Sequence, residues 1–543
     1  MAQQKKDSFV LQAGILAAAG IIVRIIGLLY RSPLTSIIGL EGNGYYTNAI
    51  NIYTIILLIS SYSIPSAISK VIAQRLAYKE YRNAQRVFQC ALIYVVVVGG
   101  VCSIVTFFGA SFLVKVDGAV PVLRVFAPTI FFSGLLGVFR GYFQAHGSML
   151  HTSLSQILEQ ILNAVVSILA AYLLIGTVSG ESETTQAVYG ASGSAIGTGA
   201  GVLIALLFMF GMYRLNSGII KRRIKRDHTP ILESYGEIFK VIITTVTPFI
   251  LSTFIYNCST VVNMYIYQYV MIDMMGVDKP ATAISYGIFS TQAITIINIP
   301  IAIASAMSSA SIPGISATYA THKENETRDK VRQAIHMTML IAIPAAVGLF
   351  VLARPVVQFI YPQKEALDTA GALVRVLAVT VVLYGLSTLT NAVLQGIGKV
   401  NIPVIHSAVS LAVQVVILVL MLLYTDLDLY ALAGANIAYS LMMCILNQFS
   451  VMKYLSYKQD VKKTYLKPIL AAIIMGAVAY GVYQGIFFLI KENRISVVVS
   501  IAFAAAVYFI LIIKLGVVNE EELRSFPKGV FLVHLAKKIH LIK

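Results

Sequence analysis

Two arginines interrupt the first long apolar stretch, in the segment GIIVRIIGLLYR at residues 20–31. Arg24 and Arg31 are seven residues apart, so on a helix both side chains project from one face, about 10 Å apart. A cation inside an apolar span costs about 2.5 to 3.5 kcal/mol unless it faces water or a partner. Because guanidinium binds phosphate in a bidentate manner, the pair predicts an anion site, with phosphate favoured. Arg31 also fits the alternative of a side chain that reaches the membrane interface.

Four further charged residues stand in or next to apolar stretches. Arg124 and Arg375 are predicted near the outer ends of their helices, where substrate contact, a side chain that reaches the membrane interface and support of the lobe are all open. Arg140 and Glu159 flank a short turn between two predicted helices. We favour a structural ion pair there over a role for Glu159 in ion coupling.

Amide side chains are numerous in the apolar stretches, and most are predicted to hydrogen-bond between helices. Asn48, Asn51 and Gln292 are candidates for lining a polar cavity. The eight histidines lack metal-ligand spacing, so no metal site is predicted. No HExxH, GxSxG or P-loop motif is present, which argues against the common hydrolases and nucleotide-dependent enzymes.

The composition assigns these residues to a membrane protein, since 58% of the 543 residues are hydrophobic and only 12% are charged. Apolar runs of about 18 to 28 residues predict an all-α polytopic membrane protein with about fourteen transmembrane helices. The predicted spans are roughly 10–31, 45–69, 88–113, 119–143, 154–176, 187–213, 238–270, 281–314, 333–353, 367–394, 402–424, 430–452, 467–490 and 495–515.

The positive charge is distributed unevenly among the predicted loops. With a cytoplasmic N-terminus, the inner segments hold about 29 Lys and Arg residues against about eight at the outer ends, which predicts that both termini are cytoplasmic. The densest basic run covers residues 221–226. We favour a positive-inside anchor for it over a nucleic-acid or lipid-headgroup patch.

An internal repeat organises the spans. Residues 122–147 align without gaps on residues 373–398, and Arg124 falls on Arg375. This offset shifts the chain by six spans, so it predicts two parallel, pseudosymmetric six-helix lobes with the substrate site between them. The predicted division is an N-terminal lobe at 1–213, a cytoplasmic basic linker at 214–237, a C-terminal lobe at 238–452, and two further helices with a cytoplasmic tail at 453–543.

Three segments resemble a known family: RIIGLLYRSPLTSIIGLEGNGYYTNA (24–49), SIPSAISKVIAQRLA (63–77) and FRGYFQAHGSMLHTSLSQILEQILN (139–163). They are similar to the polysaccharide biosynthesis branch of the multidrug/oligosaccharidyl-lipid/polysaccharide (MOP) exporter superfamily. Within that branch, the chain resembles the Gram-positive lipid II flippase MurJ family and its sporulation relative SpoVB. The resemblance covers nearly the whole chain, and the RGYFQ and SQILEQ motifs are the most specific part.

This resemblance implies a flippase in the bacterial plasma membrane that carries a lipid-linked glycan in a cationic central cavity. Arg24 and Arg31 match the arginines of the family's first helix, and the last two helices are similar to those that form its groove for the isoprenoid tail. The family's Gram-negative members carry an acidic-basic pair in helix eight, whereas residues 285–300 here are uncharged. The third cavity cation is therefore missing or supplied elsewhere, for which Arg375 is the candidate.

The expected function is translocation of an undecaprenyl-diphosphate-linked precursor, either lipid II or a polysaccharide repeat unit, from the inner to the outer leaflet. No cofactor is expected, because outward movement of an anion gains about 2.3 kcal/mol per charge per 100 mV. Coupling to Na⁺ or H⁺ stays open, as do contacts with cell-wall synthesis proteins; nucleic acid is not an expected partner. The alternatives are a multidrug or cation exporter of the same superfamily and a membrane-embedded glycan polymerase or acyltransferase.

Overall fold

The computed structural model describes residues 2–62, 64–227, 232–361, 363–524, 533–534 and 537–538, and these ranges contain helices and no strand. Twelve stretches in this part of the chain are long and apolar enough to cross a membrane. The first, Ile22–Ala77, contains two of the predicted spans, and α8 (Tyr235–Gln268) coincides with a further one. The prediction of an all-helical, multi-pass membrane protein is confirmed.

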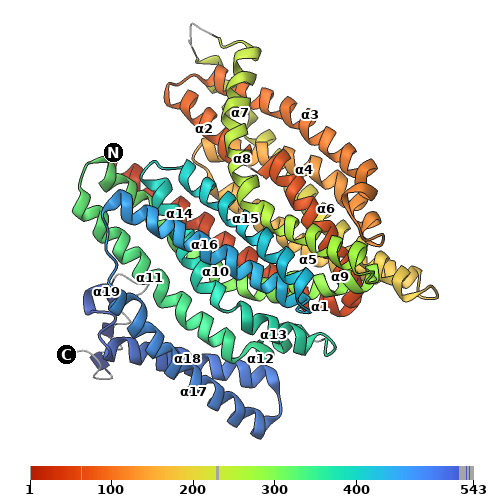
Figure 1. Cartoon of the computed structure of the whole chain (residues 1–543). Coiled ribbons are helices and arrows are strands. Elements are labelled where there is room, and N and C mark those ends of the chain that lie inside the picture. The colour runs from red at the N-terminus through yellow and green to blue at the C-terminus, as the bar shows by residue number, and fades with distance from the viewer. Residues whose placement is uncertain are drawn as a thin grey trace. The chain divides into compact units, whose positions relative to one another are not determined.

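The chain divides into two compact units, Met1–Gly287 and Ile288–Lys543. Figure 1 shows the course of the chain and the element labels. Unit 1 contains α1 (Ala2–Leu57), the π-helical turn η1 (Leu58–Tyr62), α2 (Ile64–Ala77), α3 (Tyr81–Leu113), α4 (Ala119–Ala145), α5 (Met149–Thr177), α6 (Glu183–Leu215), α7 (Ser217–Lys225), α8, η2 (Tyr269–Met274) and α9 (Lys279–Gly287).

Unit 2 contains η3 (Ile288–Ala293), α10 (Ile294–Ala320), α11 (Glu324–Val351), α12 (Ala353–Ile360), α13 (Leu367–Leu377), α14 (Val379–Gly396), α15 (Asn401–Tyr424), α16 (Leu429–Leu455), η4 (Lys462–Leu466), α17 (Lys467–Ile490), α18 (Asn493–Lys514) and α19 (Glu520–Arg524). Its core packs α10, α11, α14 and α16 together, and α17 and α18 form an antiparallel pair. A polar network crosses α14, α15 and α16, in which Asn447 contacts both His406 and Asn391 at 2.7 Å.

Gly39 divides α1 into two arms. Its backbone has φ 69° and ψ −178°, a conformation that residues other than glycine rarely adopt. The first two predicted spans therefore begin on two helices that meet at a sharp kink at Gly39, without a loop between them. The arm before Gly39 carries Arg24 and Arg31, and the arm after it carries Asn48 and Asn51.

Three glycines of α6 let it approach α5 closely. Gly193, Gly197 and Gly201 repeat every four residues, which places them on one face of the helix. A Cβ atom at each would come within 2.1 to 2.5 Å of an atom of α5. This is the small-residue packing by which membrane helices bring their backbones together, and it fixes the position of α5.

We predict that Gly197→Ala lowers the melting temperature of the detergent-solubilised protein. The new methyl group would lie 2.1 Å from Ser167 Oγ and 2.3 Å from its backbone nitrogen, and overpacking of this kind costs about 1 to 3 kcal/mol or more. Because the chain has no tryptophan, unfolding is best followed with a thiol-reactive dye that reports exposure of the buried Cys90 and Cys444. Gly211→Ala is the control on the same helix, since nothing lies within 4 Å of its Cβ position. Equal melting temperatures for the two variants would contradict close packing at Gly197.

Candidate functional site

Arg24 and Arg31 lie on the first arm of α1, as the sequence predicts. Arg24 is exposed and forms no ion pair with another residue that the structure describes, whereas Arg31 is half-buried. From the kink at Gly39, a rise of 1.5 Å per residue places Arg31 about 12 Å and Arg24 about 22 Å along the arm. Within the predicted span at 10–31, Arg24 lies seven residues from the nearer end, about 10 Å, and an unpaired cation there needs an anionic partner or water.

Helix α5 packs beside this arm and runs parallel to it. The Nε2 atom of Gln160 lies 3.3 Å from the position that a Cβ on Gly27 would take, and Leu34 and Ile38 pack against Ala171 further along both helices. Arg24, one turn before Gly27, is consequently level with the α5 turn that carries Gln156. Both glutamines are half-buried, so they can supply neutral hydrogen-bonding groups on the flank of Arg24.

From the sequence, these two glutamines are predicted only to hydrogen-bond between helices, like most amides of the apolar stretches. The signal that could have found them is their spacing, because Gln156, Gln160 and Asn163 recur at intervals of four and three residues and so fall on one face of the helix. Asn163 contributes to the contact between α5 and α6, since its Oδ1 accepts hydrogen bonds from Ser167 Oγ at 2.9 Å and Thr198 Oγ1 at 3.3 Å.

Arg140 and Glu159 form the predicted ion pair. Arg140 Nη2 lies 2.7 Å from Glu159 Oε2, and Arg140 Nε donates to Ser155 Oγ at 2.9 Å. The side chains are only 15% and 30% exposed. The pairing neutralises the one carboxylate of α5 next to the glutamines, so the positive charge of Arg24 is not cancelled by its neighbouring helix.

Asn48 and Asn51 lie on the second arm of α1 and contact other helices of unit 1. Asn48 accepts a short hydrogen bond from Gln268 Nε2 of α8 and donates to the Gly44 carbonyl at 2.9 Å. Asn51 Nδ2 donates to the Tyr286 hydroxyl of α9 at 3.5 Å. These contacts tie the second arm to α8 and α9, and a role in lining a cavity stays a prediction.

The remaining candidates are divided between the units. Arg124 is exposed near the start of α4 in unit 1, and Arg375 is exposed in the last turn of α13 in unit 2. Gln292 is 1% exposed in η3, and its Nε2 has no hydrogen-bond partner among the described residues. The contribution of these three residues to a common cationic site stays a prediction. The described residues contain no group of three His, Cys, Asp or Glu that could hold a metal ion.

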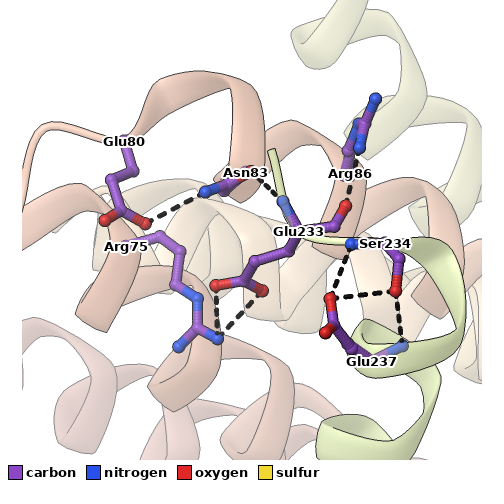
Figure 2. Close-up of polar contacts among 7 residues, drawn as sticks. All are labelled: Arg75, Glu80, Asn83, Arg86, Glu233, Ser234 and Glu237. Carbon is purple, nitrogen blue, oxygen red and sulfur yellow. Dashed lines mark hydrogen bonds and ion pairs between the residues drawn. The ribbon is translucent and has the colours of Figure 1, made fainter. Parts of the chain in front are cut away.

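A second polar cluster lies where α2 ends and α3 and α8 begin, which we call the basic end of unit 1. Figure 2 shows that Glu233 forms polar contacts with side chains of α2 and α3. Its carboxylate pairs with Arg75 at 2.9 Å, its carbonyl accepts from Arg86 Nη1 at 2.6 Å, and its N–H donates to Asn83 Oδ1 at 3.2 Å. The segment that precedes α8 is therefore fixed to the α2–α3 turn.

The opposite end of α8 is also tied to unit 1. Lys115, in the α3–α4 connection, pairs with Asp273 in η2, and Asp117 pairs with Lys279 at the start of α9 at 3.0 Å. These two ion pairs have opposite polarity and join the same two segments. Together with the contacts of Glu233, they explain why α8 and α9 belong to the first compact unit.

A capping box begins α8. The Ser234 hydroxyl accepts from the Glu237 N–H at 3.3 Å, while the Glu237 carboxylate accepts from the Ser234 N–H at 2.9 Å (Figure 2). The Ser234 N–H and then its hydroxyl stabilise the charged carboxylate, and so lower the pKa of Glu237 below its ordinary value.

We predict that Ser234→Ala speeds amide exchange in the first turn of α8 by about fivefold, the effect of losing an N-cap. The contribution of Glu237 should be complete above the ordinary pKa of glutamate and be lost as pH falls through the lowered pKa. Hydrogen exchange, corrected for intrinsic rates at each pH, measures both effects. Ser234→Thr should preserve the protection. If the first-turn amides of α8 exchange as slowly in Ser234→Ala as in Ser234→Thr, the N-cap role of Ser234 is ruled out.

The family model described as lipid II flippase MurJ matches residues 114–489, which is more than half of the chain. The chain belongs to the MurJ family. The resemblance found in the sequence is thereby confirmed.

Relatives of this MurJ-family chain match it over almost its full length. Stage V sporulation protein B of Bacillus subtilis (strain 168) is 24% identical over 531 residues, covering 96% of this chain and 98% of the relative. Lipid II flippase MurJ of the same strain is 22% identical over 515 residues, covering 90% of this chain and 91% of the relative.

Solved structures show the fold of the family. Lipid II flippase MurJ in an inward closed conformation matches with a TM-score of 0.67 at 16% identity, covering 91% of this chain and 97% of that one. An inward-facing multidrug resistance MATE family transporter of the MOP superfamily matches with a TM-score of 0.59 at 18% identity, covering 82% and 99%. The fold is therefore that of MurJ and MATE transporters.

Proposed function

We propose that this MurJ-family protein is a flippase for an undecaprenyl-diphosphate-linked cell-wall precursor, lipid II or a polysaccharide repeat unit. The observation that carries the proposal is Arg24, an exposed guanidinium deep in α1 that forms no ion pair in the described part of the chain. A diphosphate offers the charge and the paired oxygens that guanidinium binds best. No covalent step is involved, so the protein acts as a transporter rather than an enzyme.

The flank of Arg24 supports an anionic substrate rather than a cationic drug. Gln156 and Gln160 are neutral, and the neighbouring Glu159 is already paired with Arg140 at 2.7 Å. An exporter of cations would require an unpaired carboxylate beside the substrate, and Glu159 does not supply one because it is paired with Arg140. Hydrogen bonds from the two amides to phosphate or sugar oxygens would add to the charge interaction with Arg24.

Transport would proceed by alternating access, with the two six-helix lobes rearranging around the substrate. We infer that the basic end faces the cytoplasm of a bacterial cell, because its loops carry the excess of Lys and Arg. The interior-negative membrane potential then favours outward movement of the diphosphate by about 2.3 kcal/mol per charge per 100 mV. Varying the Na⁺ and H⁺ gradients at a fixed potential would test ion coupling.

The test is complementation in bacteria depleted of their own lipid II flippases, with surface-exposed lipid II as the readout. Rescue of both growth and surface lipid II is expected if lipid II is the substrate. A well-expressed wild-type protein that rescues neither would reject lipid II. A parallel strain that lacks export of a polyprenyl-linked polysaccharide unit tests the second substrate. Rescue of this strain alone would identify the polysaccharide unit as the substrate, and rescue of neither strain would reject the flippase proposal.

A further inference from the structure

A small pocket opens at the basic end of unit 1, between α7 and the ends of α2, α3 and α4. Apolar side chains, among them Leu76, Ala84 and Ile220, line one part of it. Gln85, His146 and Arg223 also line it and provide groups that can donate hydrogen bonds. The pocket thus combines an apolar surface with a cationic, hydrogen-bonding one, and it is separate from the site around Arg24.

Helix α7 carries a cluster of unpaired positive charge beside this pocket, and Arg223 of that cluster lines it. Its last turns and C-cap carry the exposed cations Lys221, Arg222, Arg223, Lys225 and Arg226. None of the five forms an ion pair with a residue in the described ranges. Asp227, the adjacent carboxylate, accepts a hydrogen bond from the Arg82 N–H at 2.6 Å. Like charges at this spacing repel each other unless an anion binds.

The apolar side chains of the same segment place α7 at the surface of a membrane. Ile220 packs against the core of unit 1, whereas Ile219 is 54% exposed and Leu215, at the end of α6, is 80% exposed. A short helix with exposed aliphatic groups beside Lys and Arg, directly after a membrane-crossing helix, is typical of an interfacial segment. A soluble anion would satisfy the charges but would leave these aliphatic groups in water.

We propose that α7 and its pocket bind an anionic phospholipid. The headgroup phosphate lies against Arg223 and its neighbouring cations, and the glycerol end contacts the apolar side of the pocket. This assignment goes beyond the positive-inside interpretation of the basic run, which requires charge but no pocket. It is independent of which glycan lipid the protein transports.

The test compares full-length variants by native mass spectrometry, counting phosphatidylglycerol and phosphatidylcholine retained as each lipid is titrated. Arg223→Gln/Lys225→Gln should weaken phosphatidylglycerol binding by about 25-fold, about fivefold for each cation, and leave phosphatidylcholine unchanged. The matched control, Lys453→Gln/Lys458→Gln, removes two exposed cations from unit 2 and should change binding less than about twofold.

Two further arms separate the pocket from bulk charge. Ile219→Asn keeps all five cations and should still weaken phosphatidylglycerol binding, because the residue lines the pocket. Retention equal to wild type in this variant, or equal losses in the two double variants, would overturn the assigned site. Displacement of the lipid by excess inorganic phosphate would overturn the phospholipid in favour of a soluble anion.

Discussion

Replacement of Arg24 by alanine is expected to reduce lipid II binding and flipping by about 10- to 100-fold, the loss that follows removal of a charge-assisted phosphate contact. The effect should be large because Arg24 lies in an apolar stretch of α1 and forms no ion pair with a described residue, so no neighbouring cation of the arm except Arg31 can replace it. Arg24→Lys should give an intermediate loss, since the ammonium retains the charge but not the bidentate geometry. Lipid II binding to purified protein and rescue of flippase-depleted cells measure the two quantities.

The control for Arg24→Ala is Arg494→Ala, which removes an exposed arginine near the start of α18. It should bind and flip at the wild-type level. If Arg24→Ala retains wild-type binding while the protein is folded and expressed equally, the assignment of the anion site to Arg24 is wrong. Arg31→Ala then decides whether the second cation carries the site alone or whether α1 has no part in binding.

The second large effect is an asymmetry between the partners of the Arg140–Glu159 pair. Arg140→Gln should reduce binding of the diphosphate lipid at least tenfold, because it releases a carboxylate beside the glutamines that flank Arg24. Glu159→Gln should bind at the wild-type level or more tightly, because the freed guanidinium adds positive charge. The double variant should recover most of the loss, and binding titrations on purified protein measure all three.

A purely structural ion pair predicts a different pattern. Removal of either partner would then lower the melting temperature and the activity to a similar extent, because each leaves one charge unpaired in a partly buried site. Equal losses in Arg140→Gln and Glu159→Gln would therefore reject the electrostatic role. Melting curves recorded beside the binding titrations keep loss of folding apart from loss of the site.

The parts of the structure that sequence could predict are those set by local pattern. Hydropathy located the membrane-crossing helices, because each span must satisfy its own backbone hydrogen bonds within a stretch of apolar residues. The Arg140–Glu159 pair was also within reach, since a short turn makes α4 and α5 neighbours and brings the two ends of that turn together. Arg24 was identifiable because a charge in an apolar run is costly wherever the helix packs.

Long-range contacts could not be predicted in this way. Glu233 contacts Arg75, which is 158 residues away in the sequence, and no local pattern in either segment indicates that the two are partners. The kink at Gly39 was hidden because glycine is common in membrane helices and only the backbone dihedral reveals its role. Gln160 was recognisable as polar but not as a neighbour of Gly27 on the arm that carries Arg24, because that relation depends on how α5 is placed by the glycines of α6.

Those glycines carry a genetic consequence. Every single-base change in a glycine codon that does not remain glycine or stop the chain introduces a side chain. At Gly193, Gly197 and Gly201, any such side chain meets α5 within about 2.5 Å. No missense step is conservative at these codons, so drift along this face of α6 is confined to synonymous changes, whereas the codon for Gly211 on the same helix is free to vary.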